Sequence, residues 1–182
     1  PLGESSRVFP ISGARRDRHR RELAAMCTPT AGTSSAVAWS QKGHAVVGDL
    51  APRLLTPAAT LAGANWLRDD LGADGKPSGR TTLAQVASWP DEVRPLPEYK
   101  ATFAYHFDDI PICREPDRAK YCRDGQCATA WFSKQVAILK DKSADRRARN
   151  QALKWIVHLV VDLHQPLHAA ADQDRGRSGV KS

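Results

Sequence analysis

Three of the six histidines fall within one short stretch, His158-Leu-Val-Val-Asp162-Leu-His164-Gln-Pro-Leu-His168. On a helix, His158 and Asp162 are four residues apart and share one face. An imidazole nitrogen and a carboxylate oxygen that point the same way form half of a zinc site. Their neighbours are apolar, and buried polar groups need a partner. The pair is therefore either a hydrogen bond inside a helix or part of a metal site.

Three other stretches combine the same kinds of groups. They are Trp39-Ser-Gln-Lys-Gly-His44, Ala87-Ser-Trp89-Pro-Asp91-Glu-Val-Arg94 and Tyr105-His106-Phe107-Asp108-Asp109. Each has an ordinary structural interpretation when it is taken alone: polar residues at a helix start, a capping turn, or a partly exposed aromatic.

Taken together and in this order, the four stretches resemble the class I single-strand-specific nucleases of the three-zinc mung bean nuclease type. Bacterial zinc phospholipase C is a more distant relative. The resemblance runs from Trp39 to about Asp174, and the His-Gln-Pro-Leu-His sequence and the Trp-x4-His start are its most specific parts. It implies a mainly α, multi-helix zinc phosphodiesterase fold of the phospholipase C/nuclease type, with its C-terminal part missing.

The resemblance also implies three zinc sites. Two of them would share Asp162, and the second would use the amino group and carbonyl of Trp39. The first site would consist of Asp91, His106, His158 and Asp162, and the second of Trp39, His44 and Asp162.

The third site would use His168 with a further histidine and aspartate downstream. No histidine follows His168 before Ser182. We therefore expect the third site to be incomplete and the chain to be a shortened member of the family. His164, which is not a ligand in the family, is interpreted as an orienting or structural residue.

The implied reaction is zinc-dependent hydrolysis of single-stranded DNA and RNA to 5′-nucleotides, with 3′-nucleotidase activity. Asp91 and Asp162 would hold the metal ions that make the nucleophile available near neutral pH. Arg94 would neutralise the phosphate in the transition state. Phe107 and Asp109 match the ring and the carboxylate that bind the base, and stacking on a ring requires an unstacked base.

Two alternatives remain open. One is a zinc phospholipase C, although Arg94, Phe107 and Asp109 favour nucleotides as substrates. The other is an inactive fragment that still binds metal or nucleic acid, which the short C-terminus favours.

Cys122 and Cys127 enclose a tight loop, and the family has a disulfide at this spacing. Cys113 would, by the same resemblance, pair with a cysteine in the missing part. A zinc site built from the three clustered cysteines would lack a fourth ligand nearby. We therefore expect the disulfide, and with it a secreted or periplasmic protein.

The elements that must position these groups are mainly helices. We expect a helix over 39–67 with breaks at Pro52 and Pro57, and a short helix over 82–88 that ends at Trp89-Pro90. Loops are predicted over 68–80, around Pro95 and Pro97, and over 113–127, with an extended or irregular segment over 101–110. The two clearest helices cover 128–139 and 145–165, and Pro166 should end or kink the second.

Length and composition suit one soluble globular domain. The chain has 182 residues, of which 41% are hydrophobic and 26% charged. Its net charge of +7 favours anionic partners. The basic run Arg146, Arg147, Arg149 and Lys154 is interpreted as a solvated helix face rather than a nucleic-acid groove. No apolar run approaches the ~20 residues that span a bilayer, and we expect a monomer.

Residues 1–38 show no helical or strand period, so we expect the domain to cover 39–182. Ala36-Val37-Ala38 matches a signal-peptidase site of the A-x-A type, but polar residues interrupt the stretch before it. The leader is therefore interpreted either as signal-like or as disordered.

Overall fold

The structure is a computed structural model that describes residues 39–111 and 115–171. The leader expected over 1–38, Cys113 and the residues from 172 onward lie outside it. The described part is mainly helical, with only two strands of two residues each, which confirms the mainly α class. None of its helices combines the length and the apolar character that crossing a membrane requires. In chain order the elements are α2 (Gln41–Leu50), η1 (Ala51–Arg53), α3 (Pro57–Leu67), α4 (Leu83–Val86), α5 (Trp89–Val93), η2 (Pro97–His106), β1 (Ile110–Pro111), α6 (Arg118–Tyr121), η3 (Arg123–Gly125), α7 (Ala128–Lys140), α8 (Arg146–Leu163), α9 (Pro166–Ala169) and β2 (Ala170–Ala171), where η marks a 3-10 helix.

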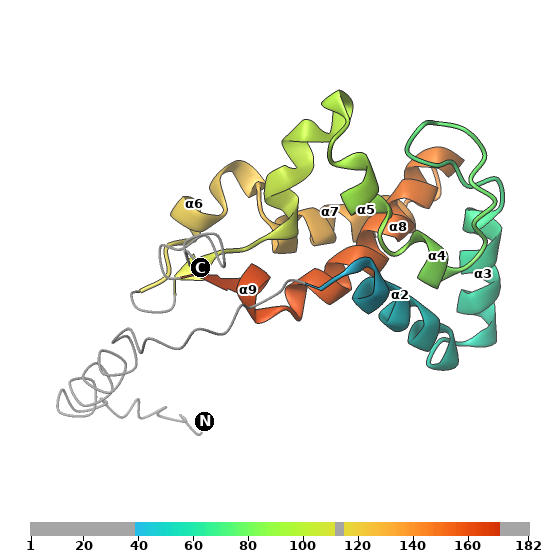
Figure 1. The fold of residues 1–182 in the computed structure, drawn as a ribbon, viewed down its shortest axis with the longest axis horizontal. Helices are drawn as coiled ribbons and strands as arrows, with labels where there is room; N and C mark the ends of the chain where they lie inside the picture. The colour runs from blue at the N-terminus through green and yellow to red at the C-terminus, as the bar shows by residue number, and fades with distance from the viewer. Residues whose placement is uncertain (1–38, 112–114, 172–182) are drawn as a thin grey trace, which may run out of the picture. The chain divides into compact units, whose positions relative to one another are not determined.

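Helix α8 is the element around which the others pack. Asp145 caps it, since its side chain accepts a hydrogen bond from the Ala148 amide at 2.8 Å. Helix α7 lies along it, and α2, α3, α4, α5 and η2 also contact it (Figure 1). Trp155 and Leu159 of α8 are buried in one core cluster with Trp89 and Val93 of α5. This packing fixes α5 against the middle of α8.

Prolines mark the boundaries of the helices: some separate two helices, and others lie in the first turn of a helix. The breaks at Pro52 and Pro57 are confirmed, because α2 ends at Leu50 and α3 begins at Pro57. The short helix expected over 82–88 forms as α4 but ends at Val86, and Trp89-Pro90, where it was expected to end, opens α5 instead. Pro97 likewise opens η2, where a loop and an extended or irregular segment were expected, and Pro166 opens α9. Proline suits a first turn because the amide hydrogen it lacks would have no partner within the helix.

A close contact places α2 beside α4. A Cβ on Gly48 would lie 2.7 Å from the backbone nitrogen and Cα of Ala84, so only glycine allows this approach. The contact holds α2 against the bundle and turns His44, one helical turn earlier, toward α8.

The segment after η2 is joined to α9. The amide of Asp108 donates to the His168 carbonyl at 2.8 Å, and β1 pairs in parallel with β2. Asp108 also accepts from the backbone amide and hydroxyl of Thr129, which fixes the first turn of α7. A disulfide between Cys122 and Cys127 precedes that turn, as the sequence predicted. The region expected to be a plain loop over 113–127 contains the short helices α6 and η3.

Candidate metal centre

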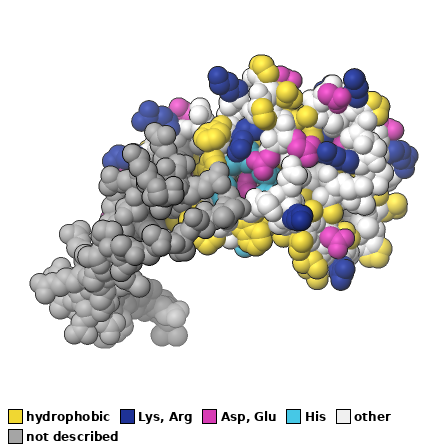
Figure 2. All heavy atoms as spheres, viewed as in Figure 1, with side chains coloured by type: hydrophobic (Ala, Val, Ile, Leu, Met, Phe, Trp, Pro, Cys, Tyr) yellow, Lys and Arg dark blue, Asp and Glu magenta, His cyan; other side chains and the backbone are white. Residues whose placement is uncertain are grey.

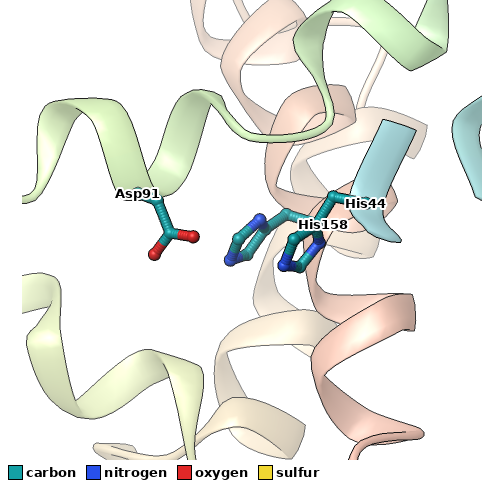
Figure 3. Close-up of side chains that lie close together, drawn as sticks. All are labelled: His44, Asp91 and His158. Atoms are coloured by element: carbon teal, nitrogen blue, oxygen red, sulfur yellow. The ribbon is translucent and has the colours of Figure 1, made fainter. Parts of the chain in front are cut away.

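Four elements bring five predicted metal ligands to one place. His44 comes from α2, Asp91 from α5 and His106 from the end of η2, while His158 and Asp162 come from α8. The four residues other than Asp91 are each at most 1% exposed. In Figure 3 the ring of His44 lies flat against that of His158, and the carboxylate of Asp91 faces them. The centroids of these two rings are 4.0 Å apart, with an angle of 8° between their planes.

The donor atoms converge around Asp162. Its Oδ2 lies 2.9 Å from Nε2 of His158 and 3.1 Å from Nδ1 of His106, and these two nitrogens are 2.9 Å apart. Its Oδ1 lies 3.5 Å from Nε2 of His44. Asp91 Oδ1 is 3.8 Å from Nδ1 of His106. Two groups of potential ligands result, His106–His158–Asp162 and His44–Asp91–His158, and in each the donor atoms lie within 4.8 Å of one another.

The orientation of His158 shows that this donor set fits a cation. Its Nδ1 lies 2.8 Å from the carbonyl of Ala87, which can only accept, so this nitrogen carries the proton. When His158 is neutral, Nε2 therefore directs its lone pair at a carboxylate oxygen of Asp162 at 2.9 Å, and the two lone pairs repel unless a positive charge lies between them. That charge is either a second proton on the ring or a bound cation. Imidazole nitrogen and carboxylate oxygen are common zinc ligands.

The tautomers of the other two imidazoles, His44 and His106, are not fixed by a hydrogen bond at their outer nitrogen. Nδ1 of His44 and Nε2 of His106 are buried and have no hydrogen-bond partner among the described residues. Either ring can therefore change its tautomer without breaking a hydrogen bond at that atom. Both can direct a lone pair into the cluster, as a metal site requires.

The pKa values of the cluster follow from burial and from mutual contacts. Burial, followed by the neighbouring His158, lowers the pKa of His44 from 6.5 to about 4. Burial also lowers the pKa of His106. For His158 burial acts downward, but the hydrogen bond and charge of Asp162 outweigh it and raise the pKa. Burial acts upward on Asp162, yet hydrogen bonds from His106 and His158 hold its pKa well below 3.8. Asp162 therefore remains a charged ligand over the ordinary pH range.

The centre opens at Asp91 and Arg94. About a third of each of these side chains is exposed, and Nη1 of Arg94 lies 3.5 Å from Oδ1 of Asp91. Figure 2 shows histidine side chains set back between acidic and basic side chains. A phosphate that approached Asp91 would therefore meet a guanidinium, which suits the predicted role of Arg94.

Of the two residues predicted to bind the base, Phe107 lies beside the centre, with its ring centroid 6.2 Å from that of His106. Phe107 is half-buried, and its ring stacks on the buried ring of His168, with centroids 4.7 Å apart and planes 3° apart. His168 belongs to neither of the two ligand groups found in the described part of the chain. Asp109 adopts a positive φ of 50°, a backbone conformation that few residues other than glycine favour.

Trp39 and His164, two further residues that the sequence singled out, lie against Gly43 and Val160 respectively. The ring of Trp39, 45% exposed, covers Gly43, where a Cβ would lie 2.6 Å from the ring. His164 is exposed, and its Nδ1 lies 2.6 Å from the Val160 carbonyl of its own helix. The structure thus favours a structural role for His164.

A buried ion pair between α8 and the loop before α4 was not predicted from the sequence. The interpretation of Lys154 as part of a solvated helix face is wrong, because the residue is 1% exposed and its Nζ lies 2.7 Å from Oδ1 of Asp70. The same ammonium lies 4.1 Å from the ring centroid of Trp89. Lys154 precedes His158 by four residues, and this spacing places both on the inward face of α8. That spacing was the signal that could have shown Lys154 to be buried.

Comparison with known proteins agrees with this geometry. The family model described as S1/P1 Nuclease matches residues 39–181. Nuclease P1 of Penicillium citrinum is 30% identical over 137 residues, which cover 73% of this chain and 48% of the relative. Endonuclease 3 of Arabidopsis thaliana is 28% identical, with 81% of this chain and 50% of the relative covered. Nuclease S1 of Aspergillus oryzae is also 28% identical, and the match covers 71% of this chain and 44% of the relative.

The chain thus spans about half the length of the curated relatives that it matches. The match nevertheless includes every element that positions the buried histidines and aspartates. The chain belongs to the S1/P1 nuclease family.

Proposed function

We propose that this chain is a zinc-dependent nuclease that hydrolyses the phosphodiester bonds of single-stranded DNA and RNA to 5′-nucleotides, with 3′-nucleotidase activity. The observation that carries the proposal is the convergence of His106, His158 and Asp162, whose donor atoms lie 2.9–3.1 Å apart and are buried. Membership of a nuclease family supports the same reaction class.

Two zinc positions are assigned from the family resemblance, and the group His106–His158–Asp162 supports the first of them. The first would be held by Asp91, His106, His158 and Asp162. The second would be held by His44 and Asp162, joined by the amino group and carbonyl of Trp39 when that residue begins the mature chain. Zinc in these positions supplies a Lewis acid and lowers the pKa of water. A third position would need ligands besides His168, which lies outside both groups.

The other residues act on the substrate or orient the ligands. Arg94 draws the phosphate toward the centre and neutralises its charge. Phe107 and Asp109 hold the base beside it. The Ala87 carbonyl keeps the proton of His158 on Nδ1, so that Nε2 stays available as a donor atom.

The Cys122–Cys127 disulfide supports an oxidising compartment, so we place the protein outside the cytoplasm, secreted or periplasmic. We propose that it acts as a monomer.

The test offers the zinc-loaded chain single-stranded DNA, RNA, duplex DNA, a 3′-nucleotide and phosphatidylcholine. We expect 5′-phosphate products from the single strands, release of phosphate from the 3′-nucleotide, and loss of both activities with chelator. Arg94→Gln serves as a matched variant that should retain zinc and lose rate. Hydrolysis of phosphatidylcholine alone would support a phospholipase instead. Zinc binding without any hydrolysis would show an inactive metal-binding fragment.

A further inference from the structure

Phe103 is an exposed aromatic ring at the rim of the metal centre. It lies on η2 and is 59% exposed. It belongs to neither hydrophobic core cluster of the described residues, whereas Tyr99 and Tyr105 of the same element pack against the core. A single exposed ring is common at protein surfaces, so the groups that surround Phe103 decide whether it can bind a ligand.

The neighbours of Phe103 are groups that the proposed function uses. The guanidinium carbon of Arg94 lies 5.6 Å from the centroid of the Phe103 ring. The ring of Phe107 is 5.5 Å away, centroid to centroid. Arg94 in turn lies 3.5 Å from Asp91 of the metal centre. A carboxylate, a guanidinium and an open ring therefore follow one another outward from the centre.

Phe103 offers more open aromatic surface than Phe107. One face of Phe107 is covered by the His168 ring at 4.7 Å, and the residue as a whole is half-buried. Phe103 keeps most of its surface open beside a cation that attracts phosphate. A nucleotide unit needs this combination, since its base stacks on a ring while its phosphate is neutralised nearby.

We propose that Phe103 is a second stacking subsite. The base that is adjacent to the one held at Phe107 in a single-stranded nucleic acid stacks on its ring. This inference rests on the proposed function, because it assigns a longer stretch of the substrate to the same centre. It makes Phe103 a residue that distinguishes oligonucleotides from mononucleotides.

The angle between the two rings accounts for a preference for single strands. Their planes are inclined by 52°, so two successive bases can lie along both rings only when they are unstacked from each other. Bases in a duplex are parallel and paired. A duplex would have to break a stacking step to use both rings, and a flexible single strand would not.

The test measures binding of a fluorescent, hydrolysis-resistant phosphorothioate oligothymidylate to the zinc-loaded full chain by anisotropy. Phe103→Ala should weaken binding by about 5- to 150-fold, which is the effect of losing one stacked base. Phe103→Leu should weaken it nearly as much, because leucine keeps the apolar volume but has no aromatic face. Phe103→Trp should restore it. Leu61→Ala, which removes an exposed apolar side chain from α3, is the control and should leave affinity unchanged.

A second arm separates this inference from the proposed function. Hydrolysis of a 3′-mononucleotide by Phe103→Ala should match that of the unchanged protein, because its single base would lie at Phe107. Failure of the unchanged protein to bind or cleave any nucleic acid would overturn the proposed function, and this inference with it. Equal oligonucleotide affinity in the unchanged protein and Phe103→Ala would overturn this inference alone, and a large fall in the Tm of that variant would then show that protein covers the ring.

Discussion

Asp162 contacts three histidines with one carboxylate. One oxygen faces His44 at 3.5 Å, and the other faces His106 and His158 at 3.1 and 2.9 Å. No other described carboxylate has this set of partners at the centre. The negative charge of Asp162 therefore decides whether divalent cations can bind among the surrounding nitrogens. Without that charge, two neighbouring cations would repel each other.

Replacing Asp162 with Asn tests this role at nearly constant volume. We predict that Asp162→Asn loses most of the zinc that the purified protein retains after dialysis, as measured by elemental analysis. The matched control is Asp49→Asn on α2, which removes an exposed carboxylate whose nearest cation is Arg53 at 3.7 Å. Unchanged zinc content in Asp162→Asn would contradict the assignment.

His44 gives the zinc-free protein a dependence on pH. Its pKa is lowered from 6.5 to about 4 in the folded state. Between these two pH values the unfolded chain binds more protons, so acidification lowers the free energy of unfolding. We predict a fall in stability from pH 6.5 to 4 in urea titrations with chelator present, and a smaller fall in His44→Gln.

The exposed His164 supplies the control for that titration. His164→Gln should keep the same fall in stability as the unchanged protein. An equal fall in His44→Gln would show that burial of His44 does not produce the dependence.

At the scale of elements, Gly48 sets how closely α2 approaches α4. Alanine at this position would place a Cβ 2.7 Å from the Ala84 backbone, where no flexible side chain can move aside. We predict that Gly48→Ala destabilises the protein by about 1–3 kcal/mol, as overpacking does. It should also weaken zinc binding, because α2 carries His44.

Gly63 on α3 is the matched comparison. A Cβ there meets nothing within 4 Å, so Gly63→Ala should stabilise the helix by about 0.4–1 kcal/mol. Urea unfolding of the two variants measures both effects. A stabilised Gly48→Ala would mean that α2 and α4 are not in close contact.

Lys154 joins α8 to the loop before α4 and to the start of α5. Its ammonium contacts Asp70 at 2.7 Å and the Leu71 carbonyl at 3.0 Å, and Ser78 donates to the other oxygen of Asp70. We predict that Lys154→Met lowers the free energy of unfolding by about 3–5 kcal/mol, because Asp70 remains buried without its counter-charge.

Adding Asp70→Asn to Lys154→Met should recover part of that loss. Lys134→Met on α7 removes a lysine whose only described contact is the ring of Trp131 at 4.6 Å, so its effect should be smaller, about 0.5–1 kcal/mol. Similar losses in both lysine variants would argue against a special role for the ion pair. Denaturant titration measures all three.

The sequence predicted the longest elements well and the short ones poorly. The apolar spacing in 145–165 and the capping Asp145 define α8 locally, and it forms over Arg146–Leu163. Proline gives a weaker signal, because it is excluded from a helix interior but favoured in a first turn. Pro90, Pro97 and Pro166 therefore lie in the first turns of α5, η2 and α9, where a helix end, a loop and a helix end or kink had been expected.

At the scale of the whole molecule, the metal centre was easier to predict than its surroundings. The four stretches that carry its ligands are far apart in the chain, and only their joint resemblance to a nuclease family linked them before the fold was known. Contacts made by residues outside these motifs could not be predicted from the resemblance. The Ala87 carbonyl on His158 and the exposed ring of Phe103 depend on how α5, η2 and α8 pack.

The central claim is that the buried His–Asp cluster holds zinc. An anomalous difference map collected at the zinc absorption edge from crystals of the zinc-loaded chain tests it most directly. The account predicts a peak bounded by His106, His158, Asp91 and Asp162, with zinc–nitrogen distances of about 2.0–2.1 Å. Zinc bound only elsewhere, or a cluster in which His158 and Asp162 remain in direct contact with no peak between them, would contradict it.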